Sequence, residues 1–248
     1  MAKKITKWEP EDFELEMTTH WSFPKRGDWA THDAKWRGNW SPYIPRNILL
    51  RYSKEEDLIL DQFAGGGTTL VEAKLLNRNS IGVDVNEVAL KRCKEKTMFE
   101  HEGANGRVYL RKGDARNLDF IPDESIDLIC THPPYADIIH YSEDIPEDLS
   151  LLKIKDFLEE MKAVASESYR TLKKDKFCAI LMGDTRQKGY IVPMSFEVMK
   201  IFEEAGFKLK ELIIKEQHNC RATEYWKTNS VKYNFLLIAH EYLFVFRK

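Results

Sequence analysis

A pair of prolines followed by an aromatic residue marks the clearest place for chemistry in this sequence. The apolar run 126–130 reads as a buried strand, and His132-Pro133-Pro134-Tyr135 comes just after it. Neither proline can donate an N–H to a sheet ladder, so the strand must end there in a stiff corner. A neutral imidazole accepts one hydrogen bond and can take a proton. His132 and the carbonyl of Pro133 can thus present two acceptors to a ligand, and Tyr135 an aromatic face.

A glycine-rich turn suggests a second site. Gly65 and Gly67 lie in LDQFAGGGTT, where the missing side chains let the backbone approach a ligand closely. Asp84 closes the next apolar run, 17 residues after Gly67, and an acidic residue there can accept hydrogen bonds from ribose hydroxyls. Asp114 follows the third run and could accept a hydrogen bond from an adenine amino group. The third glycine of G-x-G-x-x-G is missing, which favours S-adenosylmethionine over a dinucleotide.

Strands that alternate with helices must hold these motifs in place. The apolar patterns predict strands at 57–61, 80–85, 108–114, 126–130, 177–184, 209–214 and 235–246, and helices at 70–78, 87–101, 155–172 and 195–205. Such alternation predicts an α/β fold with a parallel, doubly wound sheet, in which ligands bind at the carboxyl ends of the strands. The last two strands lack a helical crossover, so we expect them to pair antiparallel at one edge.

The motifs together resemble the amino-methyltransferase family, whose members methylate N6 of adenine or N4 of cytosine. His132-Pro133-Pro134-Tyr135 is similar to the family's Asp/Asn/Ser-Pro-Pro-Tyr/Phe motif, and 63–67 to its F-x-G-x-G motif. The segment RGNWSPYIPRNILLRYS at 37–53 resembles the family's N-terminal cofactor-binding segment, which gives the gamma order of DNA methyltransferases. The resemblance implies a Rossmann-like class I fold that depends on S-adenosylmethionine, with a seven-stranded, mostly parallel sheet whose last strand is antiparallel.

The resemblance also implies roles for individual residues. Side chain 132 and the Pro133 carbonyl would orient the target amino nitrogen, and Tyr135 would stack on a base flipped out of its helix. Histidine departs from the family's Asp, Asn or Ser, so Thr131 or the backbone remains an alternative to His132. The expected catalytic residues are His132, Pro133, Pro134 and Tyr135, and the expected cofactor-binding residues are Asn39, Ser41, Asp61, Phe63, Gly65, Gly67, Thr68, Asp84 and Asp114.

Fewer residues bear on which base is methylated, and in which nucleic acid, than on the cofactor. The preceding Thr131 resembles the Thr-Ser-Pro-Pro-Tyr form of N4-cytosine enzymes, which favours cytosine N4 over adenine N6. Family members that read DNA usually carry a separate target-recognition region, whereas here the core occupies nearly the whole chain. The resemblance points to DNA, whereas the missing region points to RNA; DNA is the expected substrate, with RNA, for instance ribosomal RNA, a close alternative. A non-catalytic binding module and methylation of a protein glutamine amide are further alternatives.

Basic and aromatic residues alternate in 217–234, QHNCRATEYWKTNSVKYN, which we expect to be a loop that contacts nucleic acid. Arg186 and Lys188, which follow the fifth predicted strand, could contact phosphates. The expected nucleic-acid contacts are Arg186, Lys188, Arg221, Tyr225, Trp226 and Lys227.

Length, net charge and cysteine content limit the class of protein to which this sequence can belong. Its 248 residues carry a net charge of −2, which argues against a nucleic-acid-coating basic tail and fits one compact domain. We expect 1–52 to be a segment that packs on the cofactor site and 53–248 to be the catalytic domain. Four cysteines without CxxC spacing predict no metal site and a reduced, cytoplasmic location. No apolar stretch is long enough for a membrane span, and no obligate protein partner is evident.

Overall fold

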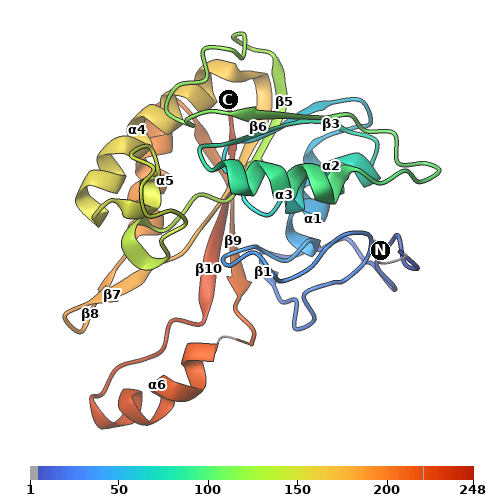
Figure 1. Ribbon diagram of the computed structural model, residues 1–248. Coiled ribbons are helices and arrows are strands. Elements are labelled where there is room, and N and C mark those ends of the chain that lie inside the picture. Colours follow the sequence, from blue (N-terminus) through green and yellow to red (C-terminus); the bar gives the residue numbers. More distant parts are fainter. Residues whose placement is uncertain (1–4, 220) are drawn as a thin grey trace.

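The computed structural model describes residues 5–219 and 221–248, and places helices on both faces of one sheet (Figure 1). In this part of the chain eight strands form the sheet, in the order β1-β9-β10-β6-β5-β2-β3-β4, and β7 and β8 form a separate hairpin. The strands are β1 (His20–Trp21), β2 (Leu58–Asp61), β3 (Asn79–Asp84), β4 (Val108–Lys112), β5 (Ile126–Thr131), β6 (Leu172–Met182), β7 (Thr185–Gln187), β8 (Tyr190–Val192), β9 (Lys208–Glu216) and β10 (His240–Arg247). The helices are α1 (Tyr43–Tyr52), α2 (Thr68–Leu75), α3 (Glu87–Thr97), α4 (Ile154–Thr171), α5 (Met194–Glu204) and α6 (Arg221–Lys232).

The sheet is parallel from β4 to β6, and β10 runs antiparallel to both of its neighbours. The predicted α/β class and reversed last strand are therefore confirmed. The last two strands, β9 and β10, also pair antiparallel with each other as expected. One detail of the prediction is wrong: the short strand β1 adds an eighth strand outside β9. Leu243, Phe244, Val245 and Phe246 are all buried, so β10 needs cover on both faces and a place inside the sheet.

Helices α4 and α5 cover one face of the sheet, and α1, α2 and α3 cover the other (Figure 1). Successive residues of a strand point to opposite faces. Ile129 and Phe244 accordingly join the core beneath α4 and α5, whereas Leu128 and Leu243 join the core beneath α1. This two-sided packing fixes the ends of the central strands, where the predicted motifs lie.

The N-terminal segment is anchored on α2 through one buried carboxylate. Glu72 is fully buried, and its Oε1 accepts a hydrogen bond of 2.7 Å from Trp29 Nε1 and lies 2.7 Å from His32 Nε2. Its Oε2 accepts a hydrogen bond of 2.9 Å from Arg46 Nη1, which comes from α1. Helix α1 was not predicted, because Pro42 and Pro45 at its start obscure the helical pattern.

The segment 217–234, predicted as a loop, contains helix α6, and β10 begins at His240 rather than at 235. We call residues 217–219 and 221–239 the arm. The arm and the β7–β8 hairpin both extend beyond the end of the sheet, away from α2 and α3 (Figure 1). Sequence patterns missed α6 because its described side chains, from 225 to 232, form no buried apolar stripe; Tyr225 and Val231, for example, are both exposed.

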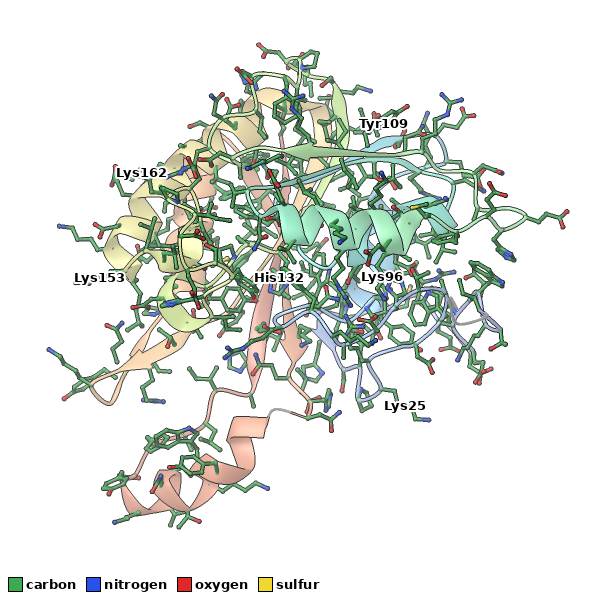
Figure 2. All side chains as sticks on the ribbon, in the orientation of Figure 1. Lys25, Lys96, Tyr109, His132, Lys153 and Lys162 are labelled. Atoms are coloured by element: carbon green, nitrogen blue, oxygen red, sulfur yellow. The ribbon has the colours of Figure 1, made fainter. Side chains whose placement is uncertain are left out.

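Side chains fill the space between the sheet and its helices, and His132 lies near the centre of the molecule (Figure 2). Cys130 and Cys178 are buried in β5 and β6, as expected of small apolar side chains. No helix in the described residues is long and apolar enough to cross a membrane. Within those same residues, no group of three or more His, Cys, Asp or Glu side chains is arranged to hold a metal ion.

Candidate active site

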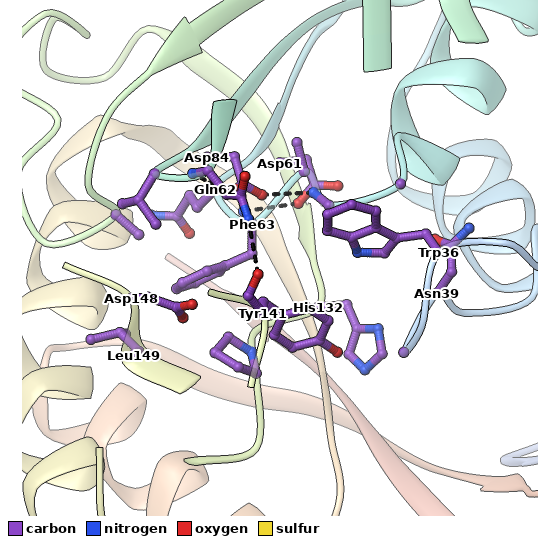
Figure 3. A pocket seen from close by; sticks show the side chains of 18 of the residues that line it. Trp36, Asn39, Asp61, Gln62, Phe63, Asp84, His132, Tyr141, Asp148 and Leu149 are labelled. Carbon is purple, nitrogen blue, oxygen red and sulfur yellow. Dashed lines mark hydrogen bonds between the residues drawn. The ribbon is translucent and has the colours of Figure 1, made fainter. Parts of the chain in front are cut away.

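A pocket of about 770 Å³ lies at the carboxyl ends of β2, β3 and β5. Asp61 and Asp84, the last residues of β2 and β3, form one wall of this pocket, and the glycine loop runs between them (Figure 3). Trp36 from the N-terminal segment and Tyr141 from the loop after β5 lie on the other side (Figure 3). The pocket therefore occupies the place where parallel sheets bind ligands. We call it the first pocket.

The glycine loop is held in one conformation by backbone hydrogen bonds to Asp84. Gly65 N donates to Oδ2 at 2.8 Å, and Asn86 N donates to Oδ1 at 2.9 Å. Gly65 has a φ of +48°, which disfavours residues with a side chain. A Cβ added to Gly66 would lie 2.9 Å from Trp36 Cβ, so the N-terminal segment closes directly over the loop.

Burial changes the acidity of both wall carboxyls. It raises the pKa of Asp84 to about 6, although the N–H groups of Asn86 and Gly65 act against it. Burial likewise raises the pKa of Asp61 to about 6, although a hydrogen bond of 2.8 Å from Thr131 Oγ1 acts to lower it. Such shifts at the mouth of a sheet are typical of functional sites.

A second, larger pocket of about 1650 Å³ adjoins the first. Trp40, His132 and Tyr141 line both pockets, so the two meet at the Pro-Pro corner. Pro134 lines the first pocket, and Pro133 lines the second.

Tyr135 lines the second pocket, and its ring packs closely on Gly183 at the end of the neighbouring strand. A Cβ added to Gly183 would lie 2.6 Å from Tyr135 Cε2. Glycine at this position therefore leaves room for the tyrosine ring.

His132 is fixed at the junction of the two pockets. Its Nε2 shares a hydrogen bond of 2.7 Å with the hydroxyl of Tyr135, and the ring of Trp40 stacks on it at 5.2 Å between centroids. The Tyr135 hydroxyl in turn donates to Glu241 Oε1 at 3.0 Å. Burial lowers the pKa of His132 to about 4, against the attraction of Glu241, so the imidazole is neutral near pH 7.

The structure brings most of the predicted site residues together. Six of the predicted cofactor residues line the first pocket, namely Asn39, Asp61, Phe63, Gly65, Asp84 and Asp114. Gly67 and Thr68 lie just behind the loop, where Thr68 Oγ1 donates to Asn39 Oδ1 at 2.6 Å. Ser41 lines the second pocket instead and donates to the Arg26 carbonyl.

The predicted nucleic-acid contacts lie outside both pockets, on the hairpin and the arm. Lys188 lies in the turn between β7 and β8, and Tyr225, Trp226 and Lys227 lie on α6. The side chain of Arg221 falls outside the described residues.

Arg186 joins the hairpin to the arm. Its guanidinium donates to the carbonyls of Gly189 and Leu236 and lies over the ring of Phe235. This predicted phosphate contact thus also has a structural role.

Several pocket residues were not predicted from the sequence. Trp36, Gln62, Tyr141 and Asp148 line the first pocket, and no motif distinguishes them. Glu241 lines the second pocket. Glu241 could have been found from the sequence, because it is a charged residue at the start of an otherwise apolar strand. Burial of a charge costs free energy, so such a residue indicates a partner of opposite charge or a hydrogen-bond donor.

Comparison with known proteins identifies the family. A family model described as DNA methylase, for N6 and N4 methyltransferases, matches residues 2–95 and 126–248. The chain belongs to this DNA methylase family. A general methyltransferase-domain model also matches residues 60–147.

Individual relatives match only part of the chain. Type II methyltransferase M.MjaVI of Methanocaldococcus jannaschii is 31% identical over 119 residues, which is 48% of this chain and 59% of that protein. A tRNA (guanine(10)-N2)-dimethyltransferase of Methanothermobacter thermautotrophicus is 35% identical over 100 residues, which is 40% of this chain and 28% of that protein. The matches thus span less than two thirds of either relative.

The solved structures agree on the fold. A SAM-dependent methyltransferase from Methanosarcina mazei superposes with a TM-score of 0.58 at 15% identity, covering 81% of this chain and 96% of that one. The chain thus has the Rossmann-like class I fold, and S-adenosylmethionine is the cofactor that its family and fold imply.

The first pocket fits this cofactor on its own features. The glycine loop and the Trp36–Asn39 segment form a narrow cradle that a Cβ at Gly66 would fill. Asp84 offers carboxylate oxygens where a ribose would bind. Gln62 lines the pocket, and its buried Nε2 finds no hydrogen-bond partner among the described residues. Such a donor is costly to leave unpaired and is satisfied if a ligand accepts from it.

Cofactor affinity should rise with pH. A carboxyl with a pKa of about 6 is mostly protonated at pH 5, whereas ribose hydroxyls donate best to the ionised form. The charge of Asp84 also contributes to the raised pKa of Asp61. We expect S-adenosylmethionine to bind about tenfold more weakly at pH 5 than at pH 7 in isothermal titration calorimetry. Asp84→Asn should weaken binding at pH 7 and flatten this dependence; a wild-type affinity that is constant from pH 5 to pH 7 would contradict it.

Proposed function

We propose that this DNA methylase transfers a methyl group from S-adenosylmethionine to the exocyclic amino group of a base in nucleic acid, with cytosine N4 in DNA as the target. The meeting of two pockets at the His132-Pro133-Pro134 corner carries this proposal. One pocket suits the cofactor, the other opens to solvent, and acceptors lie at their junction. We further propose that residues 1–52 close the first pocket and that 53–248 form the catalytic domain; the positions of Trp36 and Asn39 support this division.

Methyl transfer requires that the exocyclic amino nitrogen of the target base point its lone pair at the methyl group. S-adenosylmethionine, held by Asp84 and the glycine loop, would supply an electrophilic methyl group to the nitrogen with its sulfur as the leaving group, and the proton that the nitrogen gives up would pass to solvent. An exocyclic amino group is a poor nucleophile, because its lone pair is delocalised into the ring. His132 and the Pro133 carbonyl would accept its two N–H bonds and aim the lone pair. Tyr135 would hold the flipped base.

The arm and the hairpin would supply the contacts to the strand. Tyr225 is 73% exposed, and Trp226 packs edge-on against it at 5.4 Å between ring centroids. Lys188 is exposed at the tip of the hairpin. Exposed aromatic rings with nearby cations suit stacked bases and phosphates.

Tyr225→Ala should weaken nucleic-acid binding by roughly 1–3 kcal/mol, because one stacking surface is lost. Fluorescence anisotropy with a labelled oligonucleotide measures this, and affinity for S-adenosylmethionine should not change. Tyr109→Ala is the matched control: Tyr109 is 53% exposed on β4, on the opposite side of the molecule from the arm (Figure 2). Equal losses in the two variants would rule out a specific role for the arm.

RNA is the second candidate substrate. The tRNA methyltransferase relative supports it, since that protein's name also specifies an exocyclic amino group. Adenine N6 also remains a candidate, because the family model covers N6 as well as N4 methyltransferases.

The deciding experiment uses S-adenosylmethionine with a labelled methyl group. The protein is incubated with total DNA and with total RNA from a cell that lacks its gene, and the labelled nucleoside is identified by mass spectrometry. N4-methyl-deoxycytidine is the expected product. N4-methylcytidine would indicate an RNA enzyme, N6-methyladenine would overturn the choice of base, and label in protein alone would overturn the nucleic-acid substrate.

A further inference from the structure

An ion pair lies behind His132, away from the motif in sequence. Glu241 on β10 and Lys215 on β9 are directly opposite in the strand register, and Lys215 Nζ lies 2.9 Å from Glu241 Oε2. Both side chains are largely buried, and both line the second pocket. The other carboxylate oxygen, Oε1, accepts the hydrogen bond from Tyr135. A chain of contacts thus runs from Lys215 through Glu241 and Tyr135 to His132.

The direction of each hydrogen bond in this chain is determined. Burial alone would raise the pKa of Glu241, but the ammonium of Lys215, 2.9 Å away, holds it below its ordinary value, so Glu241 is an ionised acceptor. Burial and Glu241 raise the pKa of Tyr135 well above its ordinary value, so its hydroxyl keeps its single proton. That proton must be donated to Glu241, because a carboxylate has none to give.

The tautomer of His132 follows from this order. The Tyr135 oxygen has given its proton to Glu241, so at 2.7 Å it can only accept from His132 Nε2. A neutral imidazole carries one N–H, which is therefore on Nε2. Nδ1 keeps its lone pair, and no hydrogen-bond partner for it is found in the described part of the chain. Trp40 stacks against the ring and limits its rotation.

We propose that Glu241 and Lys215 are positioning residues that lock His132 in the Nε2–H tautomer, which makes Nδ1 the acceptor for one N–H of the target amino group. The proposal rests on the proposed function for the role of Nδ1, whereas the tautomer itself depends only on the geometry. It explains how histidine can replace the Asp, Asn or Ser of the family motif: a remote carboxylate selects the tautomer that accepts. Without this selection, Nδ1 could carry the proton and repel an amino N–H.

Glu241→Gln provides a sharp test. Lys215 can donate only to the amide oxygen, so the amide NH₂ turns toward Tyr135 and donates to its oxygen. The Tyr135 hydroxyl must then donate to His132 Nε2, which moves the ring proton to Nδ1. We expect long-range ¹H–¹⁵N spectra of histidine-labelled protein to show the Nε2–H form in the wild type and the Nδ1–H form in Glu241→Gln. The His132 signals are assigned by their absence in His132→Ala.

Activity gives the second readout. Methyl transfer by Glu241→Gln should be roughly tenfold or more slower, while affinity for S-adenosylmethionine stays within about twofold of the wild type. Glu211→Gln, the same change in the middle of β9, is the matched control and should alter neither the spectrum nor the rate. Tyr135→Phe is a second probe: it removes the partner of Nε2, and should give a mixture of tautomers even if Glu241→Gln does not fold.

The outcomes separate this proposal from the proposed function. A wild-type Nδ1–H tautomer, or an unchanged spectrum in both Glu241→Gln and Tyr135→Phe, overturns the lock. The predicted tautomers in a wild type that methylates no nucleic acid would support the lock and overturn the proposed function. The predicted change of tautomer with an unchanged rate would overturn the role of Nδ1 in the reaction.

Discussion

His132→Ala should abolish most methyl transfer while it leaves the cofactor bound. The substitution removes the imidazole at the junction of the two pockets, where an acceptor must hold the target amino group. Loss of a positioned acceptor or base of this kind costs about 10²–10⁴-fold in rate. The wall of the first pocket formed by Asp84 and the glycine loop stays intact, so calorimetry should find the wild-type affinity for S-adenosylmethionine.

Two further variants make this result specific. His132→Asn restores a short acceptor of the type found in the family motif, and should recover part of the rate that His132→Ala loses. His20→Ala removes an exposed histidine on β1 that lines neither pocket, and should behave as the wild type. Full activity in His132→Ala would transfer the role to Thr131 or the backbone. Absence of activity in the wild type itself, with cofactor bound, would favour a binding module.

Glu72→Ala should destabilise the fold by about 3–5 kcal/mol, the cost of breaking a buried ion pair from one side. The buried Arg46 would keep Glu9 but lose its partner on α2. The indole N–H of Trp29 would also lose its acceptor in a fully buried position. Urea unfolding followed by circular dichroism gives the change in the free energy of unfolding.

Glu95→Ala on α3 serves as the control for Glu72→Ala, because Glu95 is exposed to solvent. Such surface changes stay within about 0.5 kcal/mol. The comparison separates the effect of losing a buried carboxylate from the effect of losing any carboxylate. A destabilisation by Glu72→Ala as small as that of Glu95→Ala would show that the N-terminal segment does not depend on this cluster.

Local patterns in the sequence were sufficient to predict the strands and helices that form the core of the fold. Strands β2 to β6 and the helices between them appear close to their predicted places, because each has its own apolar period and its own glycine or proline boundary. Parallel strands end at one edge of a sheet, so the motifs that follow them were expected to meet there. Asp84, the glycine loop and His132 do line one pocket.

Elements whose structure depends on distant contacts escaped prediction. The described side chains of helix α6 form no buried stripe from which to read a period, and α1 begins among prolines. Strand β10 ends the chain yet lies inside the sheet, since only the packed faces of its neighbours can cover its four consecutive apolar residues. A sequence records the apolar run but not the strands that will flank it.

The sequence by itself determined the fold class, the cofactor and the residues of the Pro-Pro corner, because each depends on neighbours only a few positions away. Only the tertiary structure decided what surrounds that corner. Trp36 comes from the N-terminal segment, and Glu241 lies 106 residues from Tyr135. Hydrogen-bond partners so far apart in the chain leave no shared motif. Sheet pairing brings Glu241 opposite Lys215 and beside Tyr135, and so selects the tautomer of His132.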